Sequence, residues 1–470
     1  MKLGKAKVDR TADNQIRRIG LLSPTSGNLG NAAMQSAMIA NLRKRIAGVE
    51  FVGITLNPAE TERRHGIKAF PLAAISRPNY DLFDPANPGT PHHQIVGISL
   101  IKKWLKKVPL LHRGWRTVRA CTMELAHIRA AAHLVRKLDR IIVPGGGALD
   151  DFWGGPWGQP WALFKWSLLS RLYRVPFLFV SIGKCSLEHR ASRLFVRIAL
   201  RLAEYRSYRD HSSKIAGQSL IDAPNDPVYP DLAFSHLYSA VPTVRGDGSP
   251  EKRLIVGVSP MAYCDPRAWP RQDERRYSVY ISQLAEMVKW LIRERYRVLL
   301  FTTDSPDSAA ADDLQARIRG SASDADLIQT LPGSTEQSPD SLLKGLSCAD
   351  LVIASRLHGV ILSHLNLTPV LALSFDPKVD AHMSAVGQEN YCLNINHLQI
   401  DTLIERFTAL KAARQREQSR LRSCAMRFRH LLDQQYDGIV GTPRYNGVDS
   451  HCHNQINAGP LAEIGAFRTR

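Results

Sequence analysis

The stretch CADLVIASRLHGVILSHLNLTPVLALSFDPK, residues 348–378, decides the fold class. It contains an apolar run ending at Ser355, a turn, a helical pattern beginning with GVILSHL, and a second apolar run. This order is typical of two parallel strands joined by a crossover helix. The turn carries Arg356 and His358, although its surroundings are apolar. Such a turn lies at the carboxyl end of a strand, where α/β proteins bind ligands.

The same alternation of apolar runs and helical patterns occupies most of the chain, in two series. Helical patterns stand at 32–46, 161–173 and 277–295. The runs that read as strands lie at 17–24, 49–56, 139–147 and 175–183 in the first series, and at 252–260, 296–304, 349–359 and 368–378 in the second. The alternation predicts an α/β fold with parallel sheets covered on both faces.

The length of 470 residues indicates more than one domain, because single cores rarely grow beyond roughly 250–300 residues. Residues 238–253, rich in Gly, Pro, Ser and charge, are the expected linker. We predict an N-terminal α/β domain over 1–245, a C-terminal α/β domain over 246–400, and a helical segment with a loose tail over 401–470. Two doubly wound domains that face each other leave a cleft at the carboxyl ends of their strands.

Composition bears on compartment and partners. The formal net charge of +19 indicates nucleic acid, an anionic membrane or a phosphorylated substrate as a neighbour, or only a basic surface. The seven cysteines form no C-x-x-C pair, and HCH at 451–453 lacks a second ligand pair for zinc. The N-terminal residues lack the apolar core of a secretory signal, and no run of 18 apolar residues occurs. These features predict a cytoplasmic protein with free thiols and no clustered metal site.

Residues 102–119, KKWLKKVPLLHRGWRTVR, mix lysines and arginines with Trp104, Trp115 and leucines. The mixture suits an anionic interface, whether membrane or nucleic acid, and a solvated basic face explains it as well. Pro109 prevents a single helix through the whole stretch. Because no recognised nucleic-acid-binding module accompanies it, we expect a peripheral contact with anionic membrane and no nucleic acid.

A first glycine turn, SPTSGNLGNAA at 23–33, follows the first predicted strand. Gly27 and Gly30, on either side of Asn28 and Leu29, would let backbone N–H groups approach an anion at the N-terminus of the next helix. The alternative is a tight turn in which Asn31 caps that helix.

A second glycine turn, PGGGALDD at 144–151, follows a later strand. The amides of Gly146 and Gly147 can approach a ligand there, or the loop is only a flexible turn. Its place at the carboxyl end of a strand favours a site.

Arg356 and His358 suit anion chemistry. An arginine can hold a phosphate or carboxylate through a bidentate fork, and a histidine beside it can donate a proton near neutral pH. The alternative is a structural pair that caps the helix. Arg209 and Asp210, in YRSYRDHSS, would by themselves be read as a surface ion pair.

Together these stretches resemble the polysaccharide pyruvyl transferase family. ADLVIASRLHGVILS followed by TPVLALSFDPK looks like its C-terminal signature, and YRSYRDHSSK…YPDLAF resembles its Arg-Asp-x-x-Ser and Asp-x-x-Phe segments. The turns SGNLGN, VPGGG and SIGK resemble its earlier glycine turns, in the same order, over about residues 17–390. The chain departs from the family at Asn31, where Asp is usual, and at Lys184 and Cys185, where Pro often stands.

The resemblance implies a GT-B-like fold: two Rossmann-like domains facing a cleft. It implies transfer of the enolpyruvyl carbons of phosphoenolpyruvate onto two sugar hydroxyls, giving a pyruvate ketal and phosphate, without a metal or nucleotide cofactor. The acceptor would be a glycan of a surface or exported polysaccharide, with lipid-linked glycans among the candidates. The protein would then work in the cytoplasm, or peripherally at the inner face of the membrane.

The same resemblance assigns roles to residues. His358 matches the family's general acid. The substrate-binding positions that it suggests are Arg356, Leu357, Arg209, Lys378, Gly146, Gly147, Gly27 and Asn28. Two other functions fit the chain. A nucleotide-sugar glycosyltransferase shares the GT-B fold, although no acidic ribose contact stands out near 356–378. A non-enzymatic binder of polyanions or membranes would explain the charge.

Overall fold

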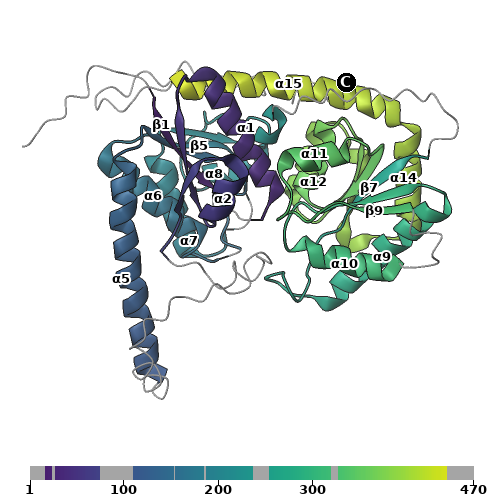
Figure 1. Ribbon diagram of the computed structural model, residues 1–470, viewed down its shortest axis with the longest axis horizontal. Helices are drawn as coiled ribbons and strands as arrows, with labels where there is room; N and C mark the ends of the chain where they lie inside the picture. Colours follow the sequence, from purple (N-terminus) through teal and green to yellow (C-terminus); the bar gives the residue numbers. More distant parts are fainter. Residues whose placement is uncertain are drawn as a thin grey trace, which may run out of the picture.

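The first half of the chain forms a parallel six-stranded sheet with the order β3-β2-β1-β4-β5-β6 (Figure 1). The computed structural model describes residues 16–23, 27–74, 109–152, 154–184, 187–236, 253–318 and 327–441. The strands of the first sheet are β1 (Arg18–Ser23), β2 (Glu50–Thr55), β3 (Lys68–Pro71), β4 (Arg140–Pro144), β5 (Phe177–Ile182) and β6 (Tyr205–Tyr208). The strand order reverses between β1 and β4, which is where doubly wound sheets bind ligands.

Helices cover both faces of this sheet. Alternate residues of the central strands point to opposite sides: Ile142 and Leu178 pack toward α1, whereas Ile141 and Phe177 pack toward α5, α6 and α7. The helical elements of this half are α1 (Leu29–Arg45), α2 (Pro58–His65), α5 (Pro109–Val135), α6 (Gln159–Tyr173), α7 (Arg190–Leu202), α8 (His211–Gln218) and the short η1 (Leu232–Ser235).

The second half repeats the topology. Its parallel sheet has the order β12-β11-β10-β7-β8-β9, which becomes the order of the first sheet when the strands are numbered from β7. Its strands are β7 (Ile255–Ser259), β8 (Arg297–Leu300), β9 (Ile328–Thr330), β10 (Leu351–Ala354), β11 (Val370–Ser374) and β12 (Cys392–Asn394). Its helical elements are α9 (Glu274–Arg293), α10 (Asp307–Ile318), α11 (Pro339–Leu346), α12 (Leu357–Leu365), α13 (Pro377–Ala385), η3 (Glu389–Tyr391), η4 (Ile395–His397) and α14 (Ile400–Ala412).

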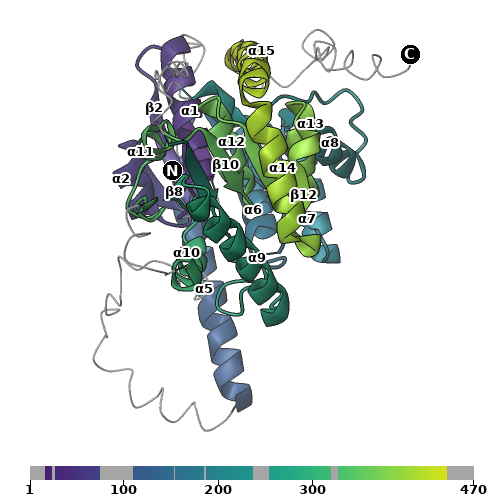
Figure 2. The same cartoon turned by 90° about the vertical axis from the view of Figure 1, so that its right-hand side faces the viewer.

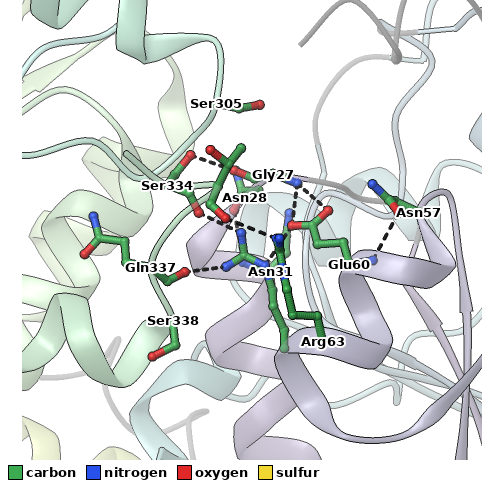
Figure 3. A network of polar contacts seen from close by, with 12 residues as sticks. Gly27, Asn28, Asn31, Asn57, Glu60, Arg63, Ser305, Ser334, Gln337 and Ser338 are labelled. Atoms are coloured by element: carbon green, nitrogen blue, oxygen red, sulfur yellow. Dashed lines mark hydrogen bonds and ion pairs between the residues drawn. The ribbon is translucent and has the colours of Figure 1, made fainter. Parts of the chain in front are cut away.

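The two halves meet at the carboxyl ends of their strands. The backbone N–H of Leu29 donates to the carbonyl oxygen of Thr303 at 2.8 Å, and that of Ser305 donates to Gly27 at 3.1 Å. The guanidinium of Arg64 reaches across to the carbonyl oxygens of Ser334 and Gln337, at 2.6 and 2.9 Å. Figure 3 shows this network, in which loops of the first half lie against loops of the second.

The last helix, α15 (Arg414–Gly441), returns from the second half to the first and lies along both (Figure 1). The Arg45 side chain of α1 forms ion pairs with Asp433 and Asp437, at 2.9 and 2.6 Å. Gln435 is buried and donates to the Ser207 hydroxyl of β6 at 2.7 Å. The helix therefore belongs to the packing of both halves.

The predicted α/β class with two Rossmann-like domains is confirmed by the two sheets. One alternative for the first glycine turn was that Asn31 caps the following helix. The N-cap of α1 is Asn28 instead, and its Oδ1 accepts from the Asn31 N–H at 3.0 Å. The predicted linker at 238–253, except for its last residue, and the tail after 441 lie outside the described residues, as do 102–108 and the side chains of 109–117. No helix in the described part of the chain has the length and apolar character needed to cross a membrane.

Candidate active site

The turn after β10 is fixed from both sides. Before it, the Ser355 hydroxyl contacts the Tyr280 hydroxyl at 2.8 Å, and both residues are buried. After it, Leu357 is buried in the hydrophobic core, so its side chain anchors the first turn of α12. Arg356 stands at the N-cap position, but its side chain makes no capping hydrogen bond. The turn is thus held without using the polar side chains of Arg356 and His358 as caps.

The guanidinium of Arg356 is half-buried and lies among acidic residues. Its Nε and Nη2 donate to the two oxygens of Asp307, each at 2.8 Å, and its Nη1 lies 3.6 Å from Asp304. The guanidinium also lies over the Trp269 ring, 5.6 Å from the centroid. One bidentate edge is therefore already occupied by a carboxylate. Burial and the neighbouring Asp307 raise the pKa of Asp304 to about 6, against the opposing effect of Arg356.

His358 lies at the N-terminus of α12, against the N-terminus of α1. A Cβ on Gly30 would fall 1.9 Å from Cγ of His358, so the imidazole occupies the space that glycine leaves. Its Nε2 is buried and forms no hydrogen bond with any described residue. The nearest carboxylate oxygen, Oδ2 of Asp231, is 3.9 Å away. A buried imidazole nitrogen without a partner is costly unless a ligand engages it.

The charges around His358 are mainly positive. Burial lowers the pKa of His358 to about 4. Asp231 raises this pKa, whereas Arg209, Lys378 and Arg356 all lower it. The imidazole is therefore neutral at pH 7 in the ligand-free protein, within electrostatic reach of three cations. An anion placed among them would favour the protonated ring.

Arg209 and His358 face the same carboxylate, that of Asp231. Its Nη1 donates to Oδ2 of Asp231 at 3.1 Å, the same oxygen that faces His358. Its guanidinium packs on Gly183, where a Cβ would lie 2.5 Å from Nη2. The Gly183 N–H in turn donates to the carbonyl of Gly146 at 2.7 Å. The pair Arg209–Asp210, read from the sequence as a surface ion pair, is half-buried, with 3.7 Å between Nε and Oδ2.

The second glycine turn, which accepts the hydrogen bond from Gly183, lines a small pocket. Gly145 and Gly146 both adopt a positive φ, of 65° and 72°. The Gln159 amide donates to the carbonyls of Gly147 and Ala148, at 3.0 and 2.8 Å, which orients the loop. The pocket is lined by Leu22, Ser23, Asn31, Pro144, Gly145, Gly146, Gly147, Ala148 and Gln159. Asn31 thus contributes to both the first and the second turn.

Gly27 and Asn28 occupy a different environment. The Gly27 N–H donates to both oxygens of Glu60 at 3.0 Å, and its carbonyl accepts from the Ser334 hydroxyl at 3.0 Å. Asn28 caps α1 and pairs with Asp304 of the second half. Figure 3 shows both in the interdomain network. Lys378, at the start of α13, forms an ion pair with Asp376 at 3.1 Å.

Several residues of this site were not selected from the sequence. Asp231 begins the DLAF segment and was quoted only as part of a motif. Asp304 and Asp307 follow β8, and the acidic residues just after this strand were the sequence feature that could have revealed them. Gly183 stands in SIGK, but its packing on Arg209 is a tertiary contact. Among the described residues, no three His, Cys, Asp or Glu side chains are grouped to hold a metal ion.

Comparisons with known proteins bear on the family and the fold. A family model described as polysaccharide pyruvyl transferase matches residues 28–377. A search of curated proteins gave no match. Similar solved structures include a complex of S. aureus MnaA with UDP (11% identity, TM-score 0.52), covering 92% of this chain and 100% of that one. A putative UDP-N-acetylglucosamine 2-epimerase from Listeria monocytogenes is similar to the same degree (11%, 0.52), covering 92% and 98%. At such identity these likenesses show the GT-B-like fold alone.

Proposed function

The chain belongs to the polysaccharide pyruvyl transferase family, an enzyme family, and on that premise we propose that it transfers the pyruvyl group of phosphoenolpyruvate onto a sugar of a surface or exported polysaccharide. One observation carries the proposal. The buried Nε2 of His358 has no hydrogen-bond partner among the described residues, and three cations act on the ring. A small molecule with a phosphate and a carboxylate fits such a site, since it needs both positive charge and a proton donor.

The reaction needs one proton delivered to carbon. His358 protonates the methylene carbon of phosphoenolpyruvate, so that the neighbouring carbon becomes electrophilic. Two hydroxyls of the sugar form bonds to that carbon, and its bond to the phosphate oxygen breaks. Of the two hydroxyl protons, one replaces the proton lost from His358 and the other leaves with the phosphate. The products are a pyruvate ketal and inorganic phosphate, and the histidine returns to its starting state.

The low pKa of His358 sets a condition on this step, because a neutral imidazole cannot act as the acid. Donor anions placed beside the ring would offset Arg209, Lys378 and Arg356, the cations that lower its pKa. Binding of phosphoenolpyruvate would thus raise the pKa of His358, and the imidazole would take up a proton from solvent. An empty site would hold no proton, and the acid would form only when the substrate is present.

The arginines have distinct roles in the proposal. Arg209 packs on Gly183 and bonds Asp231, so it is positioned to contact a donor next to His358. Arg356 contributes mainly charge and position, because Asp307 already holds its Nε and Nη2. Lys378 is a further anion contact. The pocket beside Gly146 and Gly147 offers backbone groups to either substrate.

The finer features of the proposal concern the acceptor and the location. We assign the donor to the C-terminal domain, 246–400, and the glycan acceptor to the N-terminal domain, 1–245. The protein would work in the cytoplasm, with no cofactor. Lipid-linked glycans are reasonable acceptors, which would call for a peripheral contact with the anionic inner face of the membrane, for instance through 102–119.

A ligand titration tests the donor without knowledge of the acceptor. We expect phosphoenolpyruvate to raise the melting temperature, since a ligand at one hundred times its Kd adds about 2.7 kcal/mol of stability. Inorganic phosphate and pyruvate serve as partial mimics and should act more weakly. His358→Gln should still bind the donor. No shift with phosphoenolpyruvate at millimolar concentration would refute the proposal.

A nucleotide sugar is the competing donor, because the S. aureus MnaA structure of the same fold is a UDP complex. UDP-N-acetylglucosamine is therefore titrated in parallel. A shift with the nucleotide sugar, and none with phosphoenolpyruvate, would favour the glycosyltransferase alternative.

A further inference from the structure

The outer face of the α5–α6–α7 layer carries most of the large apolar side chains that are exposed in the described residues. Seven of the ten exposed large apolar side chains in the described residues lie on it. Leu172 is 67% exposed and Trp157, just before α6, is 61% exposed. The seven are Val118, Met123, Leu125, Trp157, Leu168, Leu172 and Leu194. Single exposed apolar residues are common, but a concentration on one layer indicates an interaction surface.

The helices that carry these side chains are neighbours. α6 packs against both α5 and α7, and Figure 1 shows the three on one side of the first sheet. Aromatic rings join them at the surface: Trp157 lies 5.7 Å from Trp161 and from Phe195, and Phe164 stacks on Phe195 at 5.2 Å. α5 extends beyond the body of the protein in both views (Figure 2). The face is therefore continuous from α6 to α7 and is extended by α5.

The charge of this face is mainly positive. Between Asp151 and Glu204 the sequence has eight Lys or Arg, of which Lys165 is buried, and one acid, Glu188. That acid is paired with Arg271 of the second half. The acid of α5, Glu124, accepts from Trp161 and Lys165 at 2.9 and 2.7 Å, so it is neutralised locally. The exposed arginines of α7 are Arg190, Arg193, Arg197 and Arg201.

We propose that this outer face of α5–α7 docks on an anionic lipid surface, with the leucines and Trp157 entering the headgroup region while the arginines contact lipid phosphates. An anionic bilayer can bind both the arginines and the exposed apolar side chains, since its surface is negatively charged and an apolar layer lies below the headgroups. Nucleic acid would use the arginines but would gain little from exposed leucines. A second copy of the chain would bring arginines against arginines in a symmetric contact.

Apart from Val118, this surface lies outside residues 102–119, and it does not depend on the donor. The side chains that form it, from Val118 onward, are described, and it leaves the turn that carries Arg356 and His358 untouched. Vesicle binding can be measured without phosphoenolpyruvate or a glycan. A failure of membrane docking would therefore leave the donor chemistry standing, and the reverse also holds.

The test is co-sedimentation of the full chain with vesicles of phosphatidylcholine, with and without phosphatidylglycerol, at about 0.1 M salt. We expect binding only to the anionic vesicles. Each arginine removed should weaken binding by about fivefold, so an arginine triple variant should lose roughly a hundredfold. A leucine triple variant should lose about tenfold or more. The variants are Arg190→Gln/Arg197→Gln/Arg201→Gln and Leu168→Gln/Leu172→Gln/Leu194→Gln.

Matched controls remove similar side chains elsewhere. Exposed residues of α9 and α15 supply them, and binding should change by less than about twofold. The controls are Arg275→Gln/Arg293→Gln/Arg422→Gln and Val279→Gln/Met426→Gln. Melting temperatures show whether each variant is folded.

Several results would overturn the proposal. These are an absence of binding to anionic vesicles, equal binding to neutral ones, and equal losses in the controls. If vesicles do not bind and the arginine variant instead releases single-stranded DNA, the face serves nucleic acid. If vesicles do not bind and the leucine variant dissociates a dimer in sedimentation velocity, the face serves a second copy.

Discussion

Gly30→Ala offers the sharpest test of where His358 must lie. The added Cβ would fall 1.9 Å from Cγ and 2.2 Å from Nδ1 of the imidazole. Carbon atoms in contact lie about 3.5–4.0 Å apart, so the ring must move by roughly 1.5 Å or more. The backbone of Gly30 is not in the left-handed region, so alanine brings no strain of its own. The added methyl would also lie 2.3 Å from the Cβ of His358, so the substitution shifts the N-terminal backbone of α12 as well as the imidazole.

The effects on stability and function should separate. Alanine is better than glycine inside a helix by about 1 kcal/mol, which offsets part of the roughly 1–3 kcal/mol that overpacking costs. The melting temperature should fall by a few degrees at most. A misplacement of about 1 Å can cost about 10²-fold in rate, so turnover should fall by at least that factor.

Gly359→Ala is the matched control on the helix of His358 itself. Its Cβ would meet Ala354, Ser259 and Phe301 at 3.4, 3.5 and 3.8 Å, which are ordinary contacts. Stability should stay level or rise, and function should be unchanged.

The assay does not need the acceptor. Calorimetry of phosphoenolpyruvate binding at pH 7, in two buffers of different ionisation enthalpy, measures the protons taken up. Wild type and Gly359→Ala should take up close to one proton more than His358→Gln, because donor binding protonates the imidazole. Gly30→Ala should resemble His358→Gln. Proton uptake and turnover at wild-type levels in Gly30→Ala would refute the assigned position of the acid.

Three further predictions follow from buried groups. Burial lowers the pKa of His358 to about 4 and that of His364 to about 3, so between pH 6.5 and 4 the unfolded chain binds more protons than the folded one. Thermal melts should therefore show the free energy of unfolding falling by about 2 kcal/mol per histidine between pH 7 and pH 5, and a flat profile would contradict this. Arg356→Ala leaves Asp307 and Asp304 without their cation, and urea unfolding should show a loss of about 3–5 kcal/mol; a midpoint near wild type would contradict this. Gln435→Ala should cost about 1–3 kcal/mol in the same assay, against little for the exposed Gln434→Ala.

The fold was largely predictable because its central strands are uniform. β1, β4, β5, β7, β10 and β11 are apolar runs buried on both faces, and each was found within a few residues of its bounds. Three of the four edge strands, β3, β9 and β12, have three or four residues and are mostly half-buried or exposed, so no apolar pattern marks them. Periodicity reveals burial, and an edge strand has little of it.

The site was predictable only in part, for a related reason. His358 and Arg209 stand in short motifs of adjacent residues, which can be recognised in the sequence. The partners that define their chemistry come from far away: Asp231 for both, and Gly30 under the imidazole. Arg356 was expected to hold a donor by its fork, and the donor role stays a proposal, but Asp307 occupies that fork here. Pairing of this kind depends on tertiary structure, which a local pattern does not encode.

The return of α15 to the first half has a consequence for biosynthesis. Gln435 contacts the Tyr205 hydroxyl, 230 residues earlier in the chain. At about 5–20 residues per second, a ribosome makes that intervening stretch in roughly 10–50 s. During that time the nascent first half lacks the packing of α15 on η1, and the Ser181 hydroxyl lacks its acceptor, Gln435. The emerging chain would then be a natural client for chaperones that bind exposed apolar surface, until the last helix leaves the exit tunnel.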